Sequence, residues 1–438
     1  MAYPLITLFK SSYGSTRLSE FRAVTNREHP DLEIVFEWDE LCQFHHGGDY
    51  GPPIIQPLSA QLSPTQWANI SAQCIGNKAV FQIIGEGITL KDCVHHVGRL
   101  NDTEILTLVP STWSIQIKHL GKLRGLPQSE GRVQIEEFSH VLSILAERPV
   151  QLEQPDAELW LLKDCRRLET SETSSQMPDI HYHWLLKRIK PTVHAHADEL
   201  ATSCDIKERS FIATTTLPSD RGLLMANLAQ VRAGDCILDP FCGSGGLLIT
   251  SALLGAKVVG GDINKELLTH EDKALPLPSS RSRPNRGIEK VSYGDSFKDL
   301  GLALPILVVG ADIQDPAVIQ RYLEANRGQR YDALITDPPY GIRESRSHMS
   351  SSDIVACLCK LARDLLKVGG KIVFLQTIKG KIQQVEQRQE LIKQELESVL
   401  EAFPIRLQTV TIERFNTRRL RATVVLVKTS SFSLSGEA

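Results

Sequence analysis

Residues Cys236–Gly246 read CILDPFCGSGG and are followed by the apolar run Leu247–Ile249. An apolar strand ends there in an acid, and a turn of small residues opens an apolar helix. Gly243 and Gly245 allow a tight turn and a close approach of the backbone to a ligand, as in dinucleotide-binding folds. However, the spacing departs from the phosphate-binding fingerprint, and the carboxylate of Asp239 would repel a phosphate. The same carboxylate would attract an ammonium group, so the turn fits S-adenosylmethionine better than a nucleotide phosphate.

Two further apolar runs also end in acids. The run at 256–261 is followed by Asp262, and an acid at the end of the second strand binds ribose hydroxyls in α/β sheets. The run at 305–310 is followed by Asp312, where an adenine amino group would be bound, and Asp295 competes for that role. A single acid after a strand is more often a helix cap or a turn residue. Acids ordered strand by strand instead predict one ligand-binding rim of a doubly wound parallel sheet.

The tetrapeptide Asp337-Pro338-Pro339-Tyr340 directly follows the apolar run Ala333–Thr336. Asp337 can accept one N–H of a planar exocyclic amine, and the carbonyl of Pro338 can accept the other. The prolines fix the backbone that aims this carbonyl, and Tyr340 offers a ring on which a base can stack. Two prolines alone indicate only a turn. After the ordered acids, the tetrapeptide predicts the site of amine methylation.

These segments resemble the tRNA guanine-N2 methyltransferases of the THUMP-containing class, in particular the eukaryotic-type enzymes of tRNA guanosine 10. The resemblance rests on Asp239–Gly246 and on Ile335–Glu344. Three further segments share it: Lys207–Ile212, Leu366–Lys371 and Arg418–Leu420. It is strong over 205–428 and diffuse over the first 200 residues. It implies an α/β fold, in which a Rossmann-like class I methyltransferase sheet follows an N-terminal α+β THUMP-like RNA-binding region.

The resemblance also implies an activity and its participants. A methyl group would pass from S-adenosylmethionine to the N2 amine of a guanine in tRNA, with guanosine 10 as the expected position. Asp337, Pro338, Pro339 and Tyr340 would form the catalytic site. We expect these residues at the donor site: Thr215, Asp239, Phe241, Gly243, Gly245, Asp262, Ile263 and Asp312. Enzymes of this type work with a small zinc-binding activator subunit, so a heterodimer is expected. Two alternatives stay open: an adenine-N6 methyltransferase acting on RNA or DNA, and a catalytically silent RNA-binding subunit.

The length of 438 residues predicts two or three domains. Patterning along the chain predicts a β-rich element over 1–58, the THUMP-like region over 59–190 and the methyltransferase domain over 205–430. The net charge of −3 excludes a chain-wide surface for nucleic acid, so tRNA must meet local basic patches. The candidate patches are Lys118, His119, Lys122 and Arg124; Arg281, Arg283 and Arg286; and Arg414, Arg418, Arg419 and Arg421.

The nine cysteines are scattered without a Cys-x-x-Cys pair, so we expect neither a disulfide framework nor a bound metal. The chain start has no signal-peptide pattern, and no run approaches the ~20 apolar residues of a membrane span. Cytoplasmic localisation is therefore expected.

Overall fold

The computed structural model describes residues 3–10, 13, 15–32, 55–120, 128–164, 182–193, 196–211, 216–265, 268, 293–339, 349–379, 385–416 and 419–430. The chain divides into two compact units, which are described one after the other. The N-terminal unit comprises 1–12, 34–72 and 77–194, and the C-terminal unit comprises 13–33, 73–76 and 195–438. Among the described helices, none has the length and apolar character that crossing a membrane requires.

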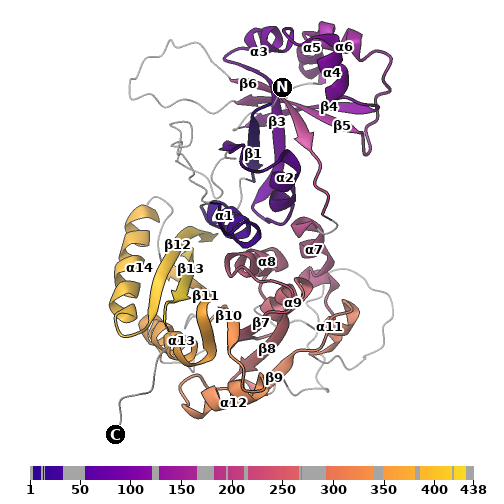
Figure 1. Cartoon of the computed structure of the whole chain (residues 1–438). Helices are drawn as coiled ribbons and strands as arrows, with labels where there is room; N and C mark the ends of the chain where they lie inside the picture. The colour runs from indigo at the N-terminus through magenta and orange to yellow at the C-terminus, as the bar shows by residue number, and fades with distance from the viewer. Residues whose placement is uncertain are drawn as a thin grey trace. The chain divides into compact units, whose positions relative to one another are not determined.

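The N-terminal unit is built on a six-stranded sheet with the order β2-β1-β3-β6-β5-β4 (Figure 1). Its strands are β1 (Leu5–Phe9), β2 (Ile55–Leu58), β3 (Asn77–Gly87), β4 (Trp113–Leu120), β5 (Ala157–Asp164) and β6 (His183–Ile189). Its helices are α2 (Pro64–Ala72), α3 (Leu90–Val97), α4 (Asp102–Leu108), α5 (Gln128–Glu136) and α6 (Ser139–Ile144). Strands β4 and β5 pair in parallel and the other neighbours are antiparallel. The predicted α+β character of this region is confirmed.

Two small cores hold the N-terminal unit together, one on each face of its sheet. One core packs side chains of α3, α4 and α6 against alternate residues of β3, β4, β5 and β6. The other gathers Trp160, Phe81 and Trp184 with aliphatic side chains of the opposite face. Because successive strand residues point to opposite faces, this sheet buries apolar side chains on both of its sides.

The C-terminal unit contains a seven-stranded sheet with the order β12-β13-β11-β10-β7-β8-β9. Its strands are β7 (Cys236–Asp239), β8 (Lys257–Asp262), β9 (Ile306–Val309), β10 (Tyr331–Thr336), β11 (Leu366–Lys379), β12 (Ile405–Asn416) and β13 (Arg419–Lys428). The pairs from β11 through β9 are parallel, whereas β13 is antiparallel to both of its neighbours. This mixed sheet is typical of class I methyltransferases. The order reverses between β7 and β10, and ligands of open α/β sheets bind beyond the strand ends at such a reversal.

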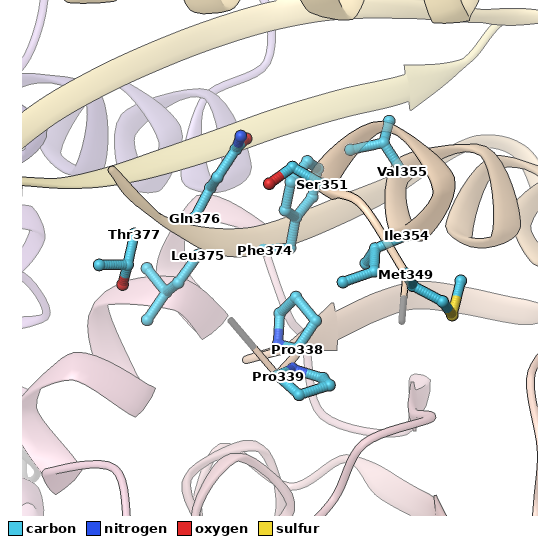
Figure 2. A pocket seen from close by; sticks show the side chains of 10 residues that line it. All are labelled: Pro338, Pro339, Met349, Ser351, Ile354, Val355, Phe374, Leu375, Gln376 and Thr377. Carbon is cyan, nitrogen blue, oxygen red and sulfur yellow. The ribbon is translucent and has the colours of Figure 1, made fainter. Parts of the chain in front are cut away.

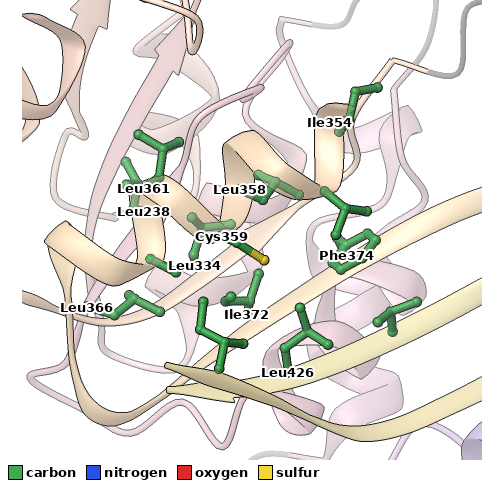
Figure 3. Packing of buried hydrophobic residues seen from close by; sticks show 14 of the residues in the cluster. Leu238, Leu334, Ile354, Leu358, Cys359, Leu361, Leu366, Ile372, Phe374 and Leu426 are labelled. Atoms are coloured by element: carbon green, nitrogen blue, oxygen red, sulfur yellow. The ribbon is translucent and has the colours of Figure 1, made fainter. Parts of the chain in front are cut away.

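Helices cover both faces of this sheet, which confirms the doubly wound architecture. They are α1 (Thr16–Glu28), α7 (Ala197–Ser203), α8 (Ser219–Leu228), α9 (Gly246–Leu253), α11 (Asp295–Asp299), α12 (Ala317–Ala325), α13 (Ser351–Leu365) and α14 (Val385–Leu400). On one face, α12, α13 and α14 pack on the strands, and Leu358 of α13 lies among Leu334, Ile372 and Phe374 (Figure 3). On the other face, α7, α8, α9 and α11 bury a second apolar cluster.

The helix α1 packs within the C-terminal unit although it lies near the chain start. The carboxylate of Glu20 accepts hydrogen bonds from the backbone N–H groups of Ile75 and Gly76 and from Nδ2 of Asn227 on α8, each 2.8 Å long. Arg27 donates to the side chain of the same Asn227 and to the carbonyl of Val231. These bonds satisfy buried polar groups that would otherwise destabilise the fold, so α1 is part of the methyltransferase-like unit.

Candidate donor and acceptor site

One side-chain hydrogen bond joins the ends of β7 and β10. Oγ1 of Thr336 donates to Oδ1 of Asp239 over 2.6 Å, and the backbone N–H of Phe241 donates to the same oxygen over 3.1 Å. The second oxygen of Asp239, Oδ2, accepts from none of the described residues. Asp239 is only 1% exposed, so its carboxylate is held in one orientation with one oxygen left for a ligand. Because Asp337 follows Thr336 directly, this bond also anchors the start of the Asp-Pro-Pro segment.

The pKa of Asp239 reflects its burial and the neighbouring acids. Burial raises the pKa of Asp239 to about 7, although the bonds from Thr336 and Phe241 lower it. The carboxylates of Asp262 and Asp337 raise that pKa further through their negative charge. The ends of β7, β8 and β10 therefore bring three carboxylates within electrostatic reach, as the ordered acids predicted. A positively charged ligand is the natural complement of such a rim.

The glycine turn between β7 and α9 is tied to the end of β8. The N–H of Gly243 donates to Oδ2 of Asp262 over 3.0 Å, and the N–H of Asn264 donates to Oδ1 over 2.8 Å. Burial raises the pKa of Asp262, and these two backbone bonds lower it. Gly243 and Gly245 have φ values of +50° and +82°, which residues with a Cβ seldom adopt. Each oxygen of Asp262 keeps lone-pair capacity for ribose hydroxyls.

Tyr293 closes the floor of this turn. A Cβ at Gly245 would lie 2.6 Å from its hydroxyl oxygen. The ring of Tyr293 packs against Phe211 and Phe297, with ring centroids 5.6 and 6.2 Å away. The phenol is therefore packed against the backbone of the turn at Gly245. Only glycine fits at 245, for reasons of both space and backbone conformation.

Gly245→Ala should therefore destabilise the C-terminal unit more than the backbone conformation alone explains. Gly234→Ala is the matched control, because Gly234 has a φ of +89° and nothing lies within 4 Å of its added Cβ. Both substitutions carry the left-handed strain of roughly 1–2 kcal/mol, and only Gly245→Ala adds an overpacking penalty of about 1–3 kcal/mol. Thermal unfolding of both variants measures the difference. Equal destabilisation would contradict the close packing of Tyr293 against Gly245.

The other predicted site residues have different surroundings. Ile263 is 63% exposed beside Asp262, whereas Phe241 is half-buried against the core of α13. Asp312 follows β9 and accepts the N–H of Gln314 over 2.9 Å, which is a turn-forming bond. Asp295 begins α11 and forms an ion pair with Lys298 over 2.9 Å.

Two predicted site residues, Thr215 and Tyr340, lie outside the described residues, as do the basic residues Lys122, Arg124, Arg281, Arg283, Arg286 and Arg418. Among the described residues, no group of three or more His, Cys, Asp or Glu side chains is arranged to hold a metal ion.

A pocket adjoins Pro338 and Pro339, beyond the end of β10 (Figure 2). Its lining residues come from the proline segment, from the start of α13 and from the end of β11: Pro338, Pro339, Met349, Ser351, Ile354, Val355, Phe374, Leu375, Gln376 and Thr377. Its cavity volume is about 50 Å³, which is room for several water molecules. Most of the lining residues are apolar, and Ser351, Gln376 and Thr377 contribute polar side chains.

Sequence reasoning missed three residues of this region. Thr336 was expected only as the end of the run that precedes Asp337, and its bond to Asp239 depends on the pairing of β10 with β7. Tyr293 and Gln376 had no predicted role. Oε1 of Gln376 is buried and has no hydrogen-bond partner among the described residues. The first was detectable in principle, because a threonine precedes the Asp-Pro-Pro segment directly.

Comparison with known families agrees with this geometry. Residues 207–401 match the family model described as RMKL-like, methyltransferase domain. The chain is 27% identical over 339 residues to a rat protein named tRNA (guanine(10)-N(2))-methyltransferase TRMT11, a match that covers 70% of this chain and 66% of the rat protein. The human protein of the same name is 26% identical over 340 residues, covering 70% and 67% of the two chains. These matches confirm the resemblance that the motifs indicate.

The chain spans less than two thirds of the length of the rat relative, and the bovine relative is covered over 57% of its length. Among solved structures, TrmN from Thermus thermophilus is similar over 97% of this chain and 99% of its own, with 14% identity and a TM-score of 0.44.

Proposed function

We propose that this chain transfers a methyl group from S-adenosylmethionine to the exocyclic N2 amine of a guanine in tRNA, at guanosine 10. One observation carries the proposal: the bond from Thr336 to Asp239 holds an acid that suits the methyl donor beside the Asp-Pro-Pro segment, which suits the amine that accepts the methyl group. A rim that can bind both an ammonium group and the N–H groups of an amine fits methyl transfer to nitrogen. The names of the curated relatives supply the substrate.

The residues of the turn fit the methyl donor. Oδ2 of Asp239 is available to the donor's ammonium group, and Asp262 at the end of β8 is available to its ribose hydroxyls. Gly243 and Gly245, both with positive φ, form the tight turn that follows Asp239 and leads into α9. When bound, S-adenosylmethionine supplies a methyl group on a positively charged sulfur. The chain itself binds and orients this group and surrounds it with three carboxylates.

Asp337 and the carbonyl of Pro338 orient the acceptor amine in this proposal. The lone pair of a guanine amine is delocalised into the ring, which makes the amine a poor nucleophile. Two hydrogen bonds from its N–H groups to these acceptors localise the lone pair and aim it toward the donor. Pro338 and Pro339 hold the acceptors rigid. A base reaches this rim only after it leaves its stack, and Tyr340 is the residue we assign to stacking on it.

The direct test is to incubate the purified chain with tRNA and labelled methyl donor, with and without the activator subunit, and to digest the tRNA. Label in N2-methylguanosine is the expected result. Label in N6-methyladenosine would show that the acceptor is adenine instead of guanine. Absence of label under both conditions would favour a catalytically silent RNA-binding protein.

The N-terminal unit is the part we assign to gripping tRNA. Nζ of Lys78 and Nζ of Lys118 lie 5.2 and 5.3 Å from the ring centroid of Trp160. Burial lowers the pKa of Lys78, and the charges of Lys118, Arg188 and Lys10 lower it further. We call these four cations the lysine cluster. Cations held this close repel one another, and a phosphate group placed among them would relieve that repulsion.

The double variant Lys78→Gln/Lys118→Gln should weaken tRNA binding and reduce its salt dependence. Each lost phosphate contact removes roughly 0.7–0.9 from the slope of log K against log salt, so a decrease of about 1.4–1.8 is expected for the two substitutions. Lys91→Gln/Arg99→Gln is the matched control, because Lys91 on α3 and Arg99 just after it are both exposed, and α3 covers the other side of the sheet. An equal decrease in both double variants would show that the lysine cluster has no special role.

A small zinc-binding activator subunit also belongs to the proposal. Strand β9 lies at the edge of the described sheet, and its residue Ile306 is 49% exposed. Leu304, just before the strand, is 57% exposed. An apolar edge strand favours the addition of a strand from another protein, which main-chain hydrogen bonds stabilise.

Ile306→Lys should therefore reduce co-purification of the activator with this chain, because charged side chains on an edge strand disfavour pairing. Co-expression followed by affinity purification measures the ratio of the two subunits. Val368→Lys is a suitable control, because Val368 is also exposed in the same unit but lies on β11, away from this edge. Full solubility and activity of the wild-type chain alone would rule the requirement out.

The cytoplasm is the compartment assigned in this proposal, because free thiols suit a reducing environment and the described cysteines are all free.

A further inference from the structure

Gln376 places a polar side chain in the wall of the pocket beside Pro338. It is 9% exposed, and its Oε1 is buried without a hydrogen-bond partner among the described residues. Leaving a buried carbonyl oxygen unpaired is unfavourable, and native structures rarely do so without a reason. The residue belongs to β11 opposite Ala422 of β13, so the neighbouring strand offers it no polar side chain.

The position of Gln376 in the pocket gives it a chemical role. In Figure 2 its amide extends toward the side of the pocket that carries Ser351, while the rings of Pro338 and Pro339 form another side. The remaining wall consists mainly of apolar side chains such as Phe374 and Ile354. A few polar groups in an apolar pocket set the orientation and the identity of the ligand.

We propose that the Gln376 amide reads the O6 and N1–H groups of the acceptor base and so makes the pocket selective for guanine. This inference rests on the proposed function. Guanine presents O6, N1–H and the N2 amine in sequence along one edge. With N2 at Asp337 and the Pro338 carbonyl, the next two groups extend away from these acceptors.

A carboxamide complements this part of guanine. Its oxygen accepts N1–H and its nitrogen donates to O6, and rotation of the amide about its last bond lets it adopt this arrangement. Adenine bound through N6 presents N1 and then a C–H group, so the same amide gains only one bond. A site that hydrogen-bonds a substrate group discriminates strongly against analogues that lack it, because its own polar atoms then stay unpaired.

The test combines two enzymes with two substrates. The variant Gln376→Leu keeps approximate size and removes the amide, and 2-aminopurine at the methylated position keeps the 2-amine but lacks O6 and N1–H. The wild-type chain should lose at least about tenfold in kcat/KM when guanine is replaced by 2-aminopurine. For Gln376→Leu, kcat/KM on guanine should fall by a similar factor, and it should fall no further when guanine is replaced by 2-aminopurine. If Gln376 had a purely structural role, the substitution would lower kcat/KM for both substrates by one common factor.

Two controls keep the result interpretable. Gln408→Leu makes the same substitution at an exposed position of β12 in the same sheet, and it should retain the wild-type preference for guanine. Thermal unfolding of Gln376→Leu should match or exceed that of the wild type, because the substitution removes a buried unpaired oxygen. An equal penalty for 2-aminopurine in wild type and Gln376→Leu would overturn the inference. Absence of guanine methylation by the wild type would instead overturn the proposed function.

Discussion

Asp337→Asn is expected to lower the single-turnover rate of methylation by about 10²–10³ while leaving the affinity for S-adenosylmethionine near the wild-type value. The substitution keeps size and shape but turns one acceptor oxygen into an N–H donor, which then faces the donor N–H of the target amine. It also removes the negative charge that would stabilise a positively charged transition state. Donor binding is assigned to the ends of β7 and β8, so it should persist. Calorimetry and rapid-quench methylation measure the two quantities separately.

Asp332→Asn is the matched control for this substitution. Asp332 lies on the same strand β10, near its opposite end, where it accepts the N–H of Cys236 and pairs with Lys367. An asparagine can keep the bond from Cys236, so only a partly exposed ion pair is lost, which is worth about 0–1 kcal/mol. Methylation by this variant should stay close to wild type. A wild-type rate for Asp337→Asn would refute its assignment as acceptor of the amine.

Much of the C-terminal unit was predictable because its signals are local. Each parallel strand is a short apolar run, and each of the acids Asp239, Asp262 and Asp337 stands at the end of its strand. Parallel strands with crossover helices necessarily bring their carboxyl ends to one rim. The order of acids along the chain therefore predicts that they meet in space, and Asp262 and Asp337 do lie close enough to Asp239 to raise its pKa.

The helix α1 was not predictable in the same way. The segment 1–58 was expected to be β-rich, but it contains the 13-residue helix α1. This helix belongs to the C-terminal unit, most of which lies beyond residue 195. Its buried face includes Arg17, Glu20 and Arg27, which a sequence pattern assigns to solvent. For Glu20 and Arg27, partners distant in sequence, among them Gly76, Asn227 and Val231, make the burial of these charges favourable. A deletion intended to isolate the methyltransferase-like unit should therefore retain residues 13–33 and 73–76.

The pocket wall was equally inaccessible to sequence reasoning, for a different reason. Gln376 and Thr377 continue an ordinary strand, and their polar side chains resemble those of any strand that reaches the surface. Both have a buried oxygen without a partner among the described residues, and this becomes visible only when α13 and the proline segment enclose them. Motifs identify the residues that hold the reacting groups, whereas specificity depends on how separate elements pack.

Asp239→Asn is expected to remove most of the donor affinity while making the folded chain more stable at alkaline pH. The variant can keep the bonds that Thr336 and Phe241 donate to Oδ1. It replaces Oδ2, the oxygen assigned to the donor's ammonium group, with an NH₂ group that repels it. A hydrogen bond between charged partners at a buried site is worth about 1.5–3 kcal/mol, so affinity should fall by roughly 10–100-fold.

The effect on stability follows from the raised pKa of Asp239. This pKa is about 7 in the folded chain and 3.8 for an ordinary aspartate, so the folded state binds the proton more tightly. The contribution of Asp239 to the free energy of unfolding is fully present below pH 3.8. It is lost as the pH rises through 7. At pH 8 the buried carboxylate costs about 4 kcal/mol, which the neutral asparagine avoids. Asp239→Asn should thus raise the thermal midpoint at pH 8, and the gain should shrink toward pH 5.

The same titration predicts how donor binding depends on pH in the wild type. Below pH 7 the protonated Asp239 must release its proton before it can accept the ammonium group, so affinity should fall by up to tenfold per pH unit. Asp239→Asn should lack this dependence. Asp235→Asn, at the opposite end of β7, is the control that should retain it. A wild-type affinity that stays constant from pH 5 to 8 would mean that the oxygen left open on Asp239 is not the donor's partner, and the site would have to be sought elsewhere on the rim.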